Sequence, residues 1–372
     1  HYSSYSNTAS ATTDIARLDT RRGDRLRTRR IHDLVAEPQT GYVLNPERSF
    51  FSVIVPEETV NLVTDPEMRS DVGWSAVGGA TITRQSEIQR RGIFAYSAYG
   101  AYAGAGIRYT LQAPLTVNQP YTFSCDLKGS GTYTLYFSTA GGSVIGRTEV
   151  VLGTSFWQRV SLSSYITSAQ VQAVSIVANE PQTTFYVDGF QVENLDHPTT
   201  FVSGAMRNAS EPGYAWLGTP HRSMSYRGLD TSGGRVTPLS DLGFEVMEFL
   251  ELGYAEQTSI FEDYALLPGS FYHGTRSTLR TFTLVGDVSA DSFVALMRKR
   301  FSIGDKIQGG DDHARPITIV FQAYDCGEPM SEEIQIRAVY KSGLGGSINN
   351  LYQERIAITC ESGDPLLSSL GN

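Results

Sequence analysis

The sequence predicts an all-β protein, and three of its features support that prediction. Apolar and polar residues alternate along 121–127, as they do on a half-buried antiparallel strand, where successive side chains point to opposite faces. Short runs rich in Tyr, Val, Thr and Phe are separated by glycine-rich turns, a composition typical of sandwiches and barrels. A convincing helical pattern occurs only near 290–301. We therefore expect β-sandwiches accompanied by one α-helix.

The 372 residues suffice for two or three domains, and changes in composition suggest three segments. Residues 1–59 are polar, then Arg-rich, and end in an apolar strand-like run closed by Pro56. Residues 60–203 are expected to form an inserted β-sandwich, with strands near 106–111, 121–128, 132–138, 157–163, 170–178 and 184–193. Residues 204–372 are expected to form a second sandwich, with strands near 244–250, 279–285, 317–323, 334–341 and 351–360.

The helix expected near 290–301 has recognisable end signals. Ser289 or Asp291 can cap its start, because a short side-chain oxygen satisfies free backbone N–H groups there. Basic residues in the last turn suit the helix dipole, and Gly304 is expected to end the helix. Helical spacing predicts one buried apolar stripe, made by Phe293, Leu296 and Met297 together with Arg300.

Charge and composition exclude several classes of function. The formal net charge of -9 disfavours general nucleic-acid binding, which needs a basic surface. The Arg-rich segment 17–30 is basic, in contrast to the negative net charge of the whole chain. We interpret it as a solvated or partner-docking arm, with a nucleic-acid arm as the minority alternative, since no aromatic residue interleaves its arginines. No stretch of 18 apolar residues is present, so no membrane insertion is expected.

The sequence offers no catalytic constellation, and we expect no enzyme. The adjacent pairs Glu57-Glu58 and Glu332-Glu333 would point to opposite faces of a strand, which rules out a two-carboxylate glycosidase site. Residues 311–313 are interpreted as a solvated turn, and no nucleophile-elbow or phosphate-loop motif occurs. Three cysteines without CxxC spacing argue against a metal cluster or a disulfide framework.

Residues 60–203 resemble a carbohydrate-binding-module jelly-roll. The residues that carry the resemblance are the opening 61–66, Trp74, and the strands 121–129, 157–160 and 185–193. The resemblance implies a fold that stacks sugars on exposed aromatic rings. It also implies a structural calcium between the opening and closing strands, with Glu67 and Asp188 at the matching places; no other cofactor is expected.

The rings expected to contact a glycan or a protein partner are Tyr96, Tyr99 and Tyr102. They lie among Gly and Ala residues, which leave the ring faces uncovered. Trp74 and Trp157 are expected in the core. The alternative is that the tyrosines line a loop or an interface and bind no sugar.

Residues 204–372 resemble the siphophage distal tail protein, the ring component of the tail tip. The resemblance lies in the order of a strand, one helix and three further strands, carried by 280–286, the helix, 316–321, 336–340 and 355–360. It implies a homo-hexameric ring in the virion, made in the host cytoplasm, that joins the tail tube protein to tail-tip hub proteins. The inserted jelly-roll would be displayed outward, with the first strands of the ring domain supplied by the residues before it. The alternatives are a carbohydrate-binding adhesin that recognises host surface glycans and, less favoured, a glycosidase accessory chain.

Overall fold

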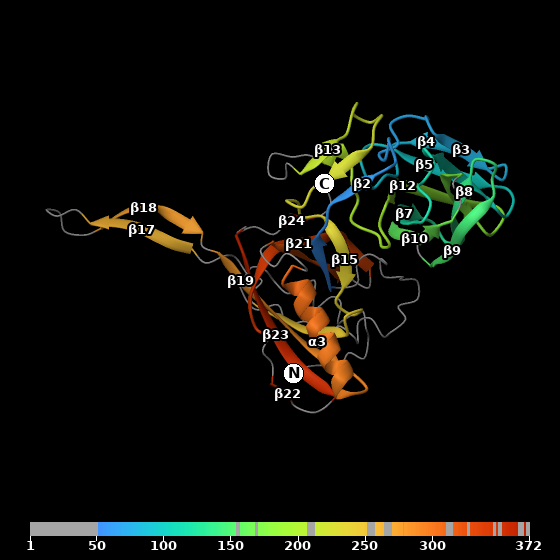
Figure 1. Cartoon of the computed structure of the whole chain (residues 1–372). Coiled ribbons are helices and arrows are strands. Elements are labelled where there is room, and N and C mark those ends of the chain that lie inside the picture. The colour runs from blue at the N-terminus through green and yellow to red at the C-terminus, as the bar shows by residue number, and fades with distance from the viewer. Residues whose placement is uncertain are drawn as a thin grey trace. The chain divides into compact units, whose positions relative to one another are not determined.

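The structure, a computed structural model, describes residues 51–153, 157–167, 170–206, 213–250, 257–263, 270–277, 279–309, 315–325, 328–344, 347–348, 352–363 and 368–369 (Figure 1). Antiparallel strands dominate these residues and a single α-helix accompanies them, so the predicted all-β class is confirmed. The segments 17–30 and 311–313 lie outside the described residues. None of the described helices has the length and hydropathy needed to cross a membrane.

The chain forms two compact units. Of the described chain, the sandwich unit comprises residues 56–236, and the helix unit comprises 51–55 together with the residues from 237 onward. The chain therefore leaves the helix unit after Val55 and returns to it at Thr237. The sandwich unit extends past the predicted boundary at 203, because strand β14 (Ser225–Arg227) pairs with β2 (Thr59–Asn61) where the chain enters the unit.

The sandwich unit is built from two five-stranded antiparallel sheets. The first sheet has the order β10 (Gln158–Ile166), β7 (Gln119–Lys128), β12 (Thr183–Glu193), β5 (Ala95–Gly100) and β4 (Thr81–Gln85). The second has the order β3 (Trp74–Val77), β6 (Ala105–Thr110), β11 (Val171–Ala178), β8 (Gly131–Thr139) and β9 (Val144–Leu152). Along the chain the strands switch repeatedly between the sheets, as they do in a jelly-roll.

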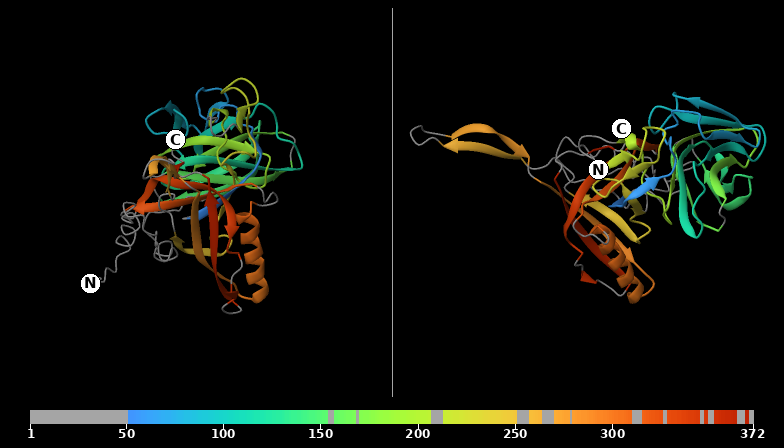
Figure 2. Two further views of the ribbon diagram at one scale, coloured as in Figure 1. Left: turned by 90° about the vertical axis from the view of Figure 1, so that its left-hand side faces the viewer. Right: turned by 45° about the horizontal axis from the view of Figure 1, so that its top comes forward.

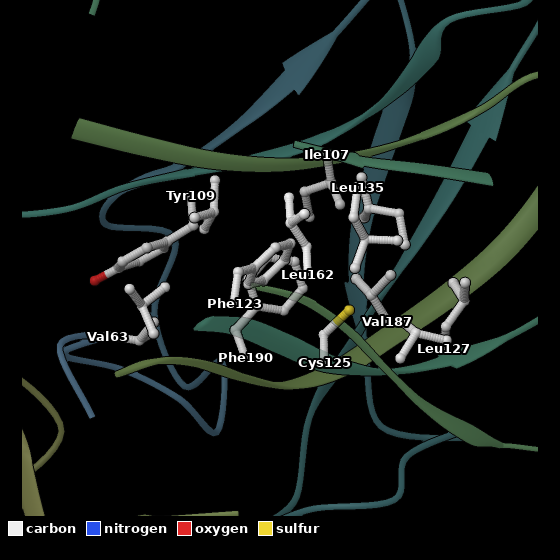
Figure 3. Packing of buried hydrophobic residues seen from close by; sticks show 14 of the residues in the cluster. Val63, Ile107, Tyr109, Phe123, Cys125, Leu127, Leu135, Leu162, Val187 and Phe190 are labelled. Carbon is white, nitrogen blue, oxygen red and sulfur yellow. The ribbon is translucent and has the colours of Figure 1, made fainter. Parts of the chain in front are cut away.

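The core of this unit lies between the two sheets (Figure 3). Phe123, Cys125 and Leu127 point into it from β7, while the intervening residues face the other way, as the predicted period-two alternation requires. Trp74 is buried as expected, with its ring centroid 5.1 Å from that of Tyr96. Trp157, also expected in the core, is only partly buried.

A small third sheet completes the sandwich unit. β13 (Tyr214–Trp216) pairs with β14, which in turn pairs with β2. A short 3-10 helix, η2 (Gly204–Met206), precedes it. Gly204 is required next to this sheet, because a Cβ atom there would lie 2.4 Å from the Trp216 ring.

The helix unit is organised around one long antiparallel sheet. Its order is β15 (Gly234–Pro238), β1 (Phe51–Pro56), β20 (Ile317–Asp325), β21 (Glu328–Ser342), β23 (Gln353–Ser362), β19 (Arg280–Ser289) and β16 (Phe244–Leu250), with β22 (Ser347–Ile348) on β23 and β24 (Ser368–Ser369) on β21. β1, which precedes the sandwich unit in sequence, pairs with β20, which follows it.

Helix α3 (Phe293–Ile307) packs against this sheet (Figure 1). Leu296 is fully buried, as expected, together with Ile303 and Ile307. The expected burial of Phe293 is wrong, because its side chain is 42% exposed. The helix starts after the cap Ser292 and runs past Gly304 to Ile307, and over this longer span the buried stripe is centred on 296, 303 and 307.

The helix unit also contains a separate hairpin of β17 (Gln257–Asp263) and β18 (Ser270–Ser277). These two strands pair with each other over seven positions and belong to no larger sheet among the described strands. Figure 2 shows them as a ribbon that no other drawn strand joins. Cys360 lies in the core of the unit as a free thiol, and burial raises its pKa to about 12. Of the other two cysteines, Cys125 is likewise buried, whereas Cys326 lies outside the described residues.

Candidate functional site

The predicted tyrosines do not share one surface. Tyr96 and Tyr99 are three residues apart on β5, and an odd spacing on a strand places side chains on opposite faces. Tyr96 is 2% exposed and lies in the core against Trp74. Its hydroxyl donates to Asp71 Oδ1 at 2.6 Å, and burial together with this bond raises the pKa of Tyr96. Tyr96 therefore presents no ring face to a ligand.

Tyr99 and Tyr102 are exposed, as the sequence suggested. Tyr99 is 45% exposed on the outer surface of β5, and Tyr102 is more exposed still on the connection to β6. Tyr99 pairs with Thr184 of β12 and with Thr81 of β4. Cross-strand partners share a face, so these threonine hydroxyls lie beside the Tyr99 ring.

Tyr186 is a further aromatic residue on the same surface. It lies two residues beyond Thr184 on β12, so it shares the outer face and is a diagonal neighbour of Tyr99. We call this surface the tyrosine face, and its members are Thr81, Thr83, Ser97, Tyr99, Thr184 and Tyr186. All six are exposed or partly exposed. Tyrosine rings among hydroxyl groups combine an apolar platform with hydrogen-bonding groups.

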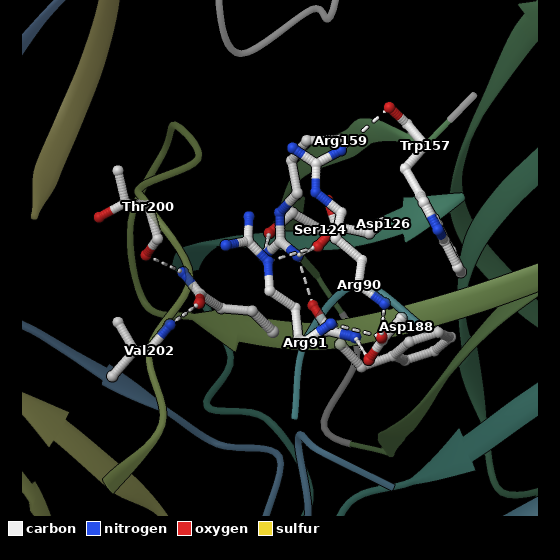
Figure 4. A network of polar contacts seen from close by, with 12 residues as sticks. Arg90, Arg91, Ser124, Asp126, Trp157, Arg159, Asp188, Thr200 and Val202 are labelled. Atoms are coloured by element: carbon white, nitrogen blue, oxygen red, sulfur yellow. Dashed lines mark hydrogen bonds and ion pairs between the residues drawn. The ribbon is translucent and has the colours of Figure 1, made fainter. Parts of the chain in front are cut away.

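Next to the tyrosine face, the outer surface of the same sheet is closed to solvent. The outward positions of β7 and β12 that follow it carry Asp126 and Asp188, which face each other across the two strands. Both carboxylates are fully buried beneath a network of arginines (Figure 4). The outer face of this sheet is therefore open at the tyrosine end and sealed at the aspartate end.

Asp126 is the centre of that network. Its carboxylate lies 2.9 Å from Arg91 Nε, 3.4 Å from Arg159 Nη1 and 3.6 Å from Arg90 Nε. Burial alone would raise the pKa of Asp126, but the three guanidinium groups outweigh it and hold this pKa well below its usual range. Arg159 is itself buried and donates from Nη2 to Ser124 Oγ at 2.8 Å. Asp126 and Arg159 are thus paired where water cannot reach them.

Asp188 anchors the segment that carries the arginines. Its Oδ2 accepts the backbone N–H groups of Arg90 at 2.7 Å and Arg91 at 2.6 Å, and its Oδ1 accepts that of Gly189 at 2.6 Å. Burial raises the pKa of Asp188 to about 7 despite these bonds. Gly189 has a φ of +55° at the β12 bulge, and a Cβ atom there would lie 2.8 Å from Asp126 Oδ2.

Glu67, the other predicted calcium ligand, is also engaged by protein donors. Its Oε1 accepts from Ser203 Oγ at 2.6 Å, and its Oε2 accepts from Arg69 Nε at 3.0 Å. Calcium needs six to eight oxygen ligands, roughly. Among the described residues, no group of three or more His, Cys, Asp or Glu side chains could hold a metal ion. The cationic and N–H donors around Glu67 and Asp188 do not fit calcium, and both carboxylates hold loops in place instead.

The helix unit carries two exposed apolar surfaces. On the β17–β18 hairpin, Phe261 is 59% exposed, and its ring centroid lies 5.7 Å from that of Tyr272, with Ile260 exposed beside it. On α3, the side chains of Phe293, Val294 and Phe301 point away from the core, and Phe301 is 74% exposed. Large exposed apolar side chains gathered in this way mark interaction surfaces.

Sequence reasoning missed Tyr186 and the hairpin. The alternation along 183–193 contains the signal for Tyr186, since Thr184, Tyr186 and Asp188 occupy the outward positions of that strand. The runs 257–263 and 270–277 were not assigned as strands, because neither has the apolar content of a core strand.

Comparison with known proteins gives only distant likenesses. No protein-family model matches the chain, and no curated protein sequence matches it. Among solved structures, it is similar to a CBM22-1 xylan-binding domain from Paenibacillus barcinonensis, with 13% identity, a TM-score of 0.31, and coverage of 39% of this chain and 99% of that one. A second CBM22 xylan-binding domain has 16% identity, a TM-score of 0.29, and coverage of 38% and 96%.

A phage protein is among the similar structures as well. The enzymatically active domain of bacteriophage CBA120 tailspike protein 4 has 11% identity and a TM-score of 0.29, with coverage of 36% of this chain and 21% of that one. Likenesses of this size carry no argument about ligand or activity.

Proposed function

We propose that this chain is a structural component of a phage tail tip or baseplate. In this proposal it forms a closed ring, six copies in number, that joins the tail tube to the tip and holds the sandwich unit outward in the virion. It has no catalytic role. The observation that carries the proposal is the β17–β18 hairpin, with Ile260, Phe261 and Tyr272 exposed on two strands that, among the described strands, pair only with each other.

A hairpin of this kind needs a neighbour. An isolated two-stranded hairpin is at best marginally stable in water, and its outer edges offer unpaired backbone groups to another chain. Covering the Phe261–Tyr272 pair would remove apolar surface from water, which stabilises association. The hairpin is therefore best explained as part of an interface.

The neighbour that best fits the hairpin is a second copy of this chain. The helix unit carries a different apolar surface on α3, formed by Phe293, Val294 and Phe301. When two different surfaces of one chain meet head to tail, the assembly closes into a ring if the rotation between copies permits. The order β19, α3, β20, β21, β23 also matches the order of elements in the distal tail proteins that 204–372 resemble.

The test is the oligomeric state of the full chain and of a hairpin variant. We expect negative-stain electron microscopy and mass photometry to detect rings for the wild type, and monomers for F261S/Y272S. The variant V72S/I93S is the control, because it removes two comparably exposed apolar side chains from the sandwich unit. A wild-type chain that stays monomeric at micromolar concentration and inside an assembled tail would overturn the proposal.

The tyrosine face favours a second role, contact with a glycan. Tyr99 and Tyr186 present rings on the open end of the sheet, ringed by threonine and serine hydroxyls. We expect Y99A/Y186A to lose glycan-array binding while its melting temperature stays unchanged. Y165A, which removes an exposed tyrosine from β10, should bind like the wild type. Retained binding by Y99A/Y186A would exclude the tyrosine face.

A further inference from the structure

The second sheet of the sandwich unit carries a row of polar side chains on its outer surface. The strand registers align one residue from each of β3, β6, β11, β8 and β9 across the sheet, so that all five share a face. The residues of this row, in order, are Ser75, Arg108, Ser175, Tyr136 and Arg147. We call it the arginine row.

The arginine row lies opposite the core. The next residue along each inner strand points inward: Tyr109 on β6, Val174 on β11 and Phe137 on β8 are all buried in the core between the sheets. Side chains alternate along a strand, so Arg108 and Tyr136 face outward. Arg108 and Arg147 are three strand spacings apart, about 14 Å between their backbones.

Neither arginine of the row is neutralised. Arg108 donates from Nε to Ser175 Oγ at 3.4 Å, and no carboxylate lies within ion-pair distance of Arg108 or Arg147 in the described part of the chain. Glu149 lies on the same face of β9, two residues from Arg147, and is also without an ion pair there. Two free guanidinium groups on a chain of net charge -9 make this face locally basic.

The middle of the row offers further polar groups. Tyr136 lies between the two arginines with 9% of its surface exposed. Ser138, two residues further along β8 and on the same face, has a buried hydroxyl that makes no hydrogen bond among the described residues. A buried hydroxyl without a partner costs free energy, and a bound ligand or water that reaches it would recover that cost.

From this arrangement we propose that the arginine row binds an anionic saccharide, one bearing carboxylate or sulfate groups. Arg108 and Arg147 hold the acidic groups, because the guanidinium fork matches a carboxylate or sulfate in geometry and charge. Between them, the sugar contacts the exposed 9% of Tyr136, since Ser175 and Ser138 beside it are fully buried. The inference rests on the proposed glycan contact of the sandwich unit, but it uses the opposite sheet and a different ligand class.

The test is affinity electrophoresis of the full chain in gels that contain one polymer each. Polygalacturonate and dextran sulfate distinguish carboxylate from sulfate, and methyl-esterified polygalacturonate and dextran are their uncharged counterparts. We expect one or both acidic polymers to retard the chain and the uncharged ones not to. R108Q/R147Q should weaken binding about tenfold or more, since two charge-assisted contacts are lost.

The control is R222Q/R298Q, which changes the net charge equally at exposed residues that are not members of the row. If the double variant fails to fold, the single variant R147Q, which changes an exposed side chain, replaces it in the binding test. Absence of retardation by both acidic polymers, or equal weakening by the two arginine pairs, would overturn the inference. If Tyr99 and Tyr186 still mediate binding of an uncharged glycan in that case, the proposed function stands and only this site falls.

Discussion

Replacing Asp126 by Asn tests the polar network that seals the outer face of the first sheet. Asn has nearly the same shape but no charge, so the substitution leaves Arg90, Arg91 and Arg159 around a neutral group. Asp126 and Arg159 are fully buried, and water cannot replace the lost charge. Removing one partner of a buried ion pair costs about 3–5 kcal/mol of unfolding free energy.

Tryptophan fluorescence is suited to measure this loss. The chain has 3 tryptophans, Trp74, Trp157 and Trp216, and all of them lie in the sandwich unit, so their fluorescence follows the unfolding of that unit alone. For a unit of this size, the expected loss lowers the melting temperature by roughly 6–20 °C. E149Q, which neutralises an exposed carboxylate without an ion pair in the described residues, should melt like the wild type.

The pH dependence supplies a second check on Asp126. Its pKa is lowered in the folded state, so its contribution to stability is present above the unfolded value of 3.8 and is lost as the pH falls through the folded pKa. The difference between wild type and D126N should therefore shrink in acid. If D126N melts within about 1 °C of E149Q near neutral pH, the arginines are not held by this charge and the reasoning is refuted.

Three further predictions concern other parts of the molecule. L296A should lower the free energy of unfolding of the helix unit by about 2–5 kcal/mol, because Leu296 is fully buried. Urea titrations followed by circular dichroism would measure this loss, and the control V294A, on the exposed side of α3, should change the free energy little. Equal effects of the two substitutions would contradict the orientation of α3. Burial alone would lower the pKa of His197, but hydrogen bonds with Glu57 and Asp196 raise this pKa overall. The protonated His197 therefore stabilises the fold below the unfolded pKa of 6.5, and this contribution is lost as the pH rises through the folded pKa. The melting-temperature gap between wild type and H197Q should therefore close on going from about pH 5 to about pH 9, and a constant gap would exclude this linkage. Residues 56–236 expressed alone should unfold in one cooperative thermal transition, since their strands pair almost entirely within that range; an unstructured product by circular dichroism would show that they need the helix unit.

Local patterns in the sequence were enough for the fold class and for much of the core. Alternation along 121–127 identified β7 and its inward residues, and one stretch of helical spacing identified α3. Both patterns depend only on the periodicity of the backbone, which neighbouring residues impose on one another. The order of elements after residue 280 was likewise readable, since each element has its own periodicity and end signals.

The sequence was less reliable about which face of an element is buried. Phe293 fits an apolar stripe within 290–301, but the helix continues to Ile307 and buries a stripe centred on Leu296 and Ile303. Tyr96 and Tyr99 appear equivalent in a Gly/Ala-rich segment, yet one lies in the core and the other on the surface. In both cases the answer depends on the bounds and type of the element, which packing decides.

By itself, therefore, the sequence determined the all-β class, the long helix near 290–301 and the alternation of its core strands. Only the tertiary structure decided which side chains meet: Tyr186 beside Tyr99, Asp126 beneath three arginines, and Arg108 in one row with Arg147. These groups come from strands far apart in the chain, and their alignment is set by strand register. A change of register by one residue would turn each side chain to the opposite face, so the proposed binding surfaces exist only in the folded sheets.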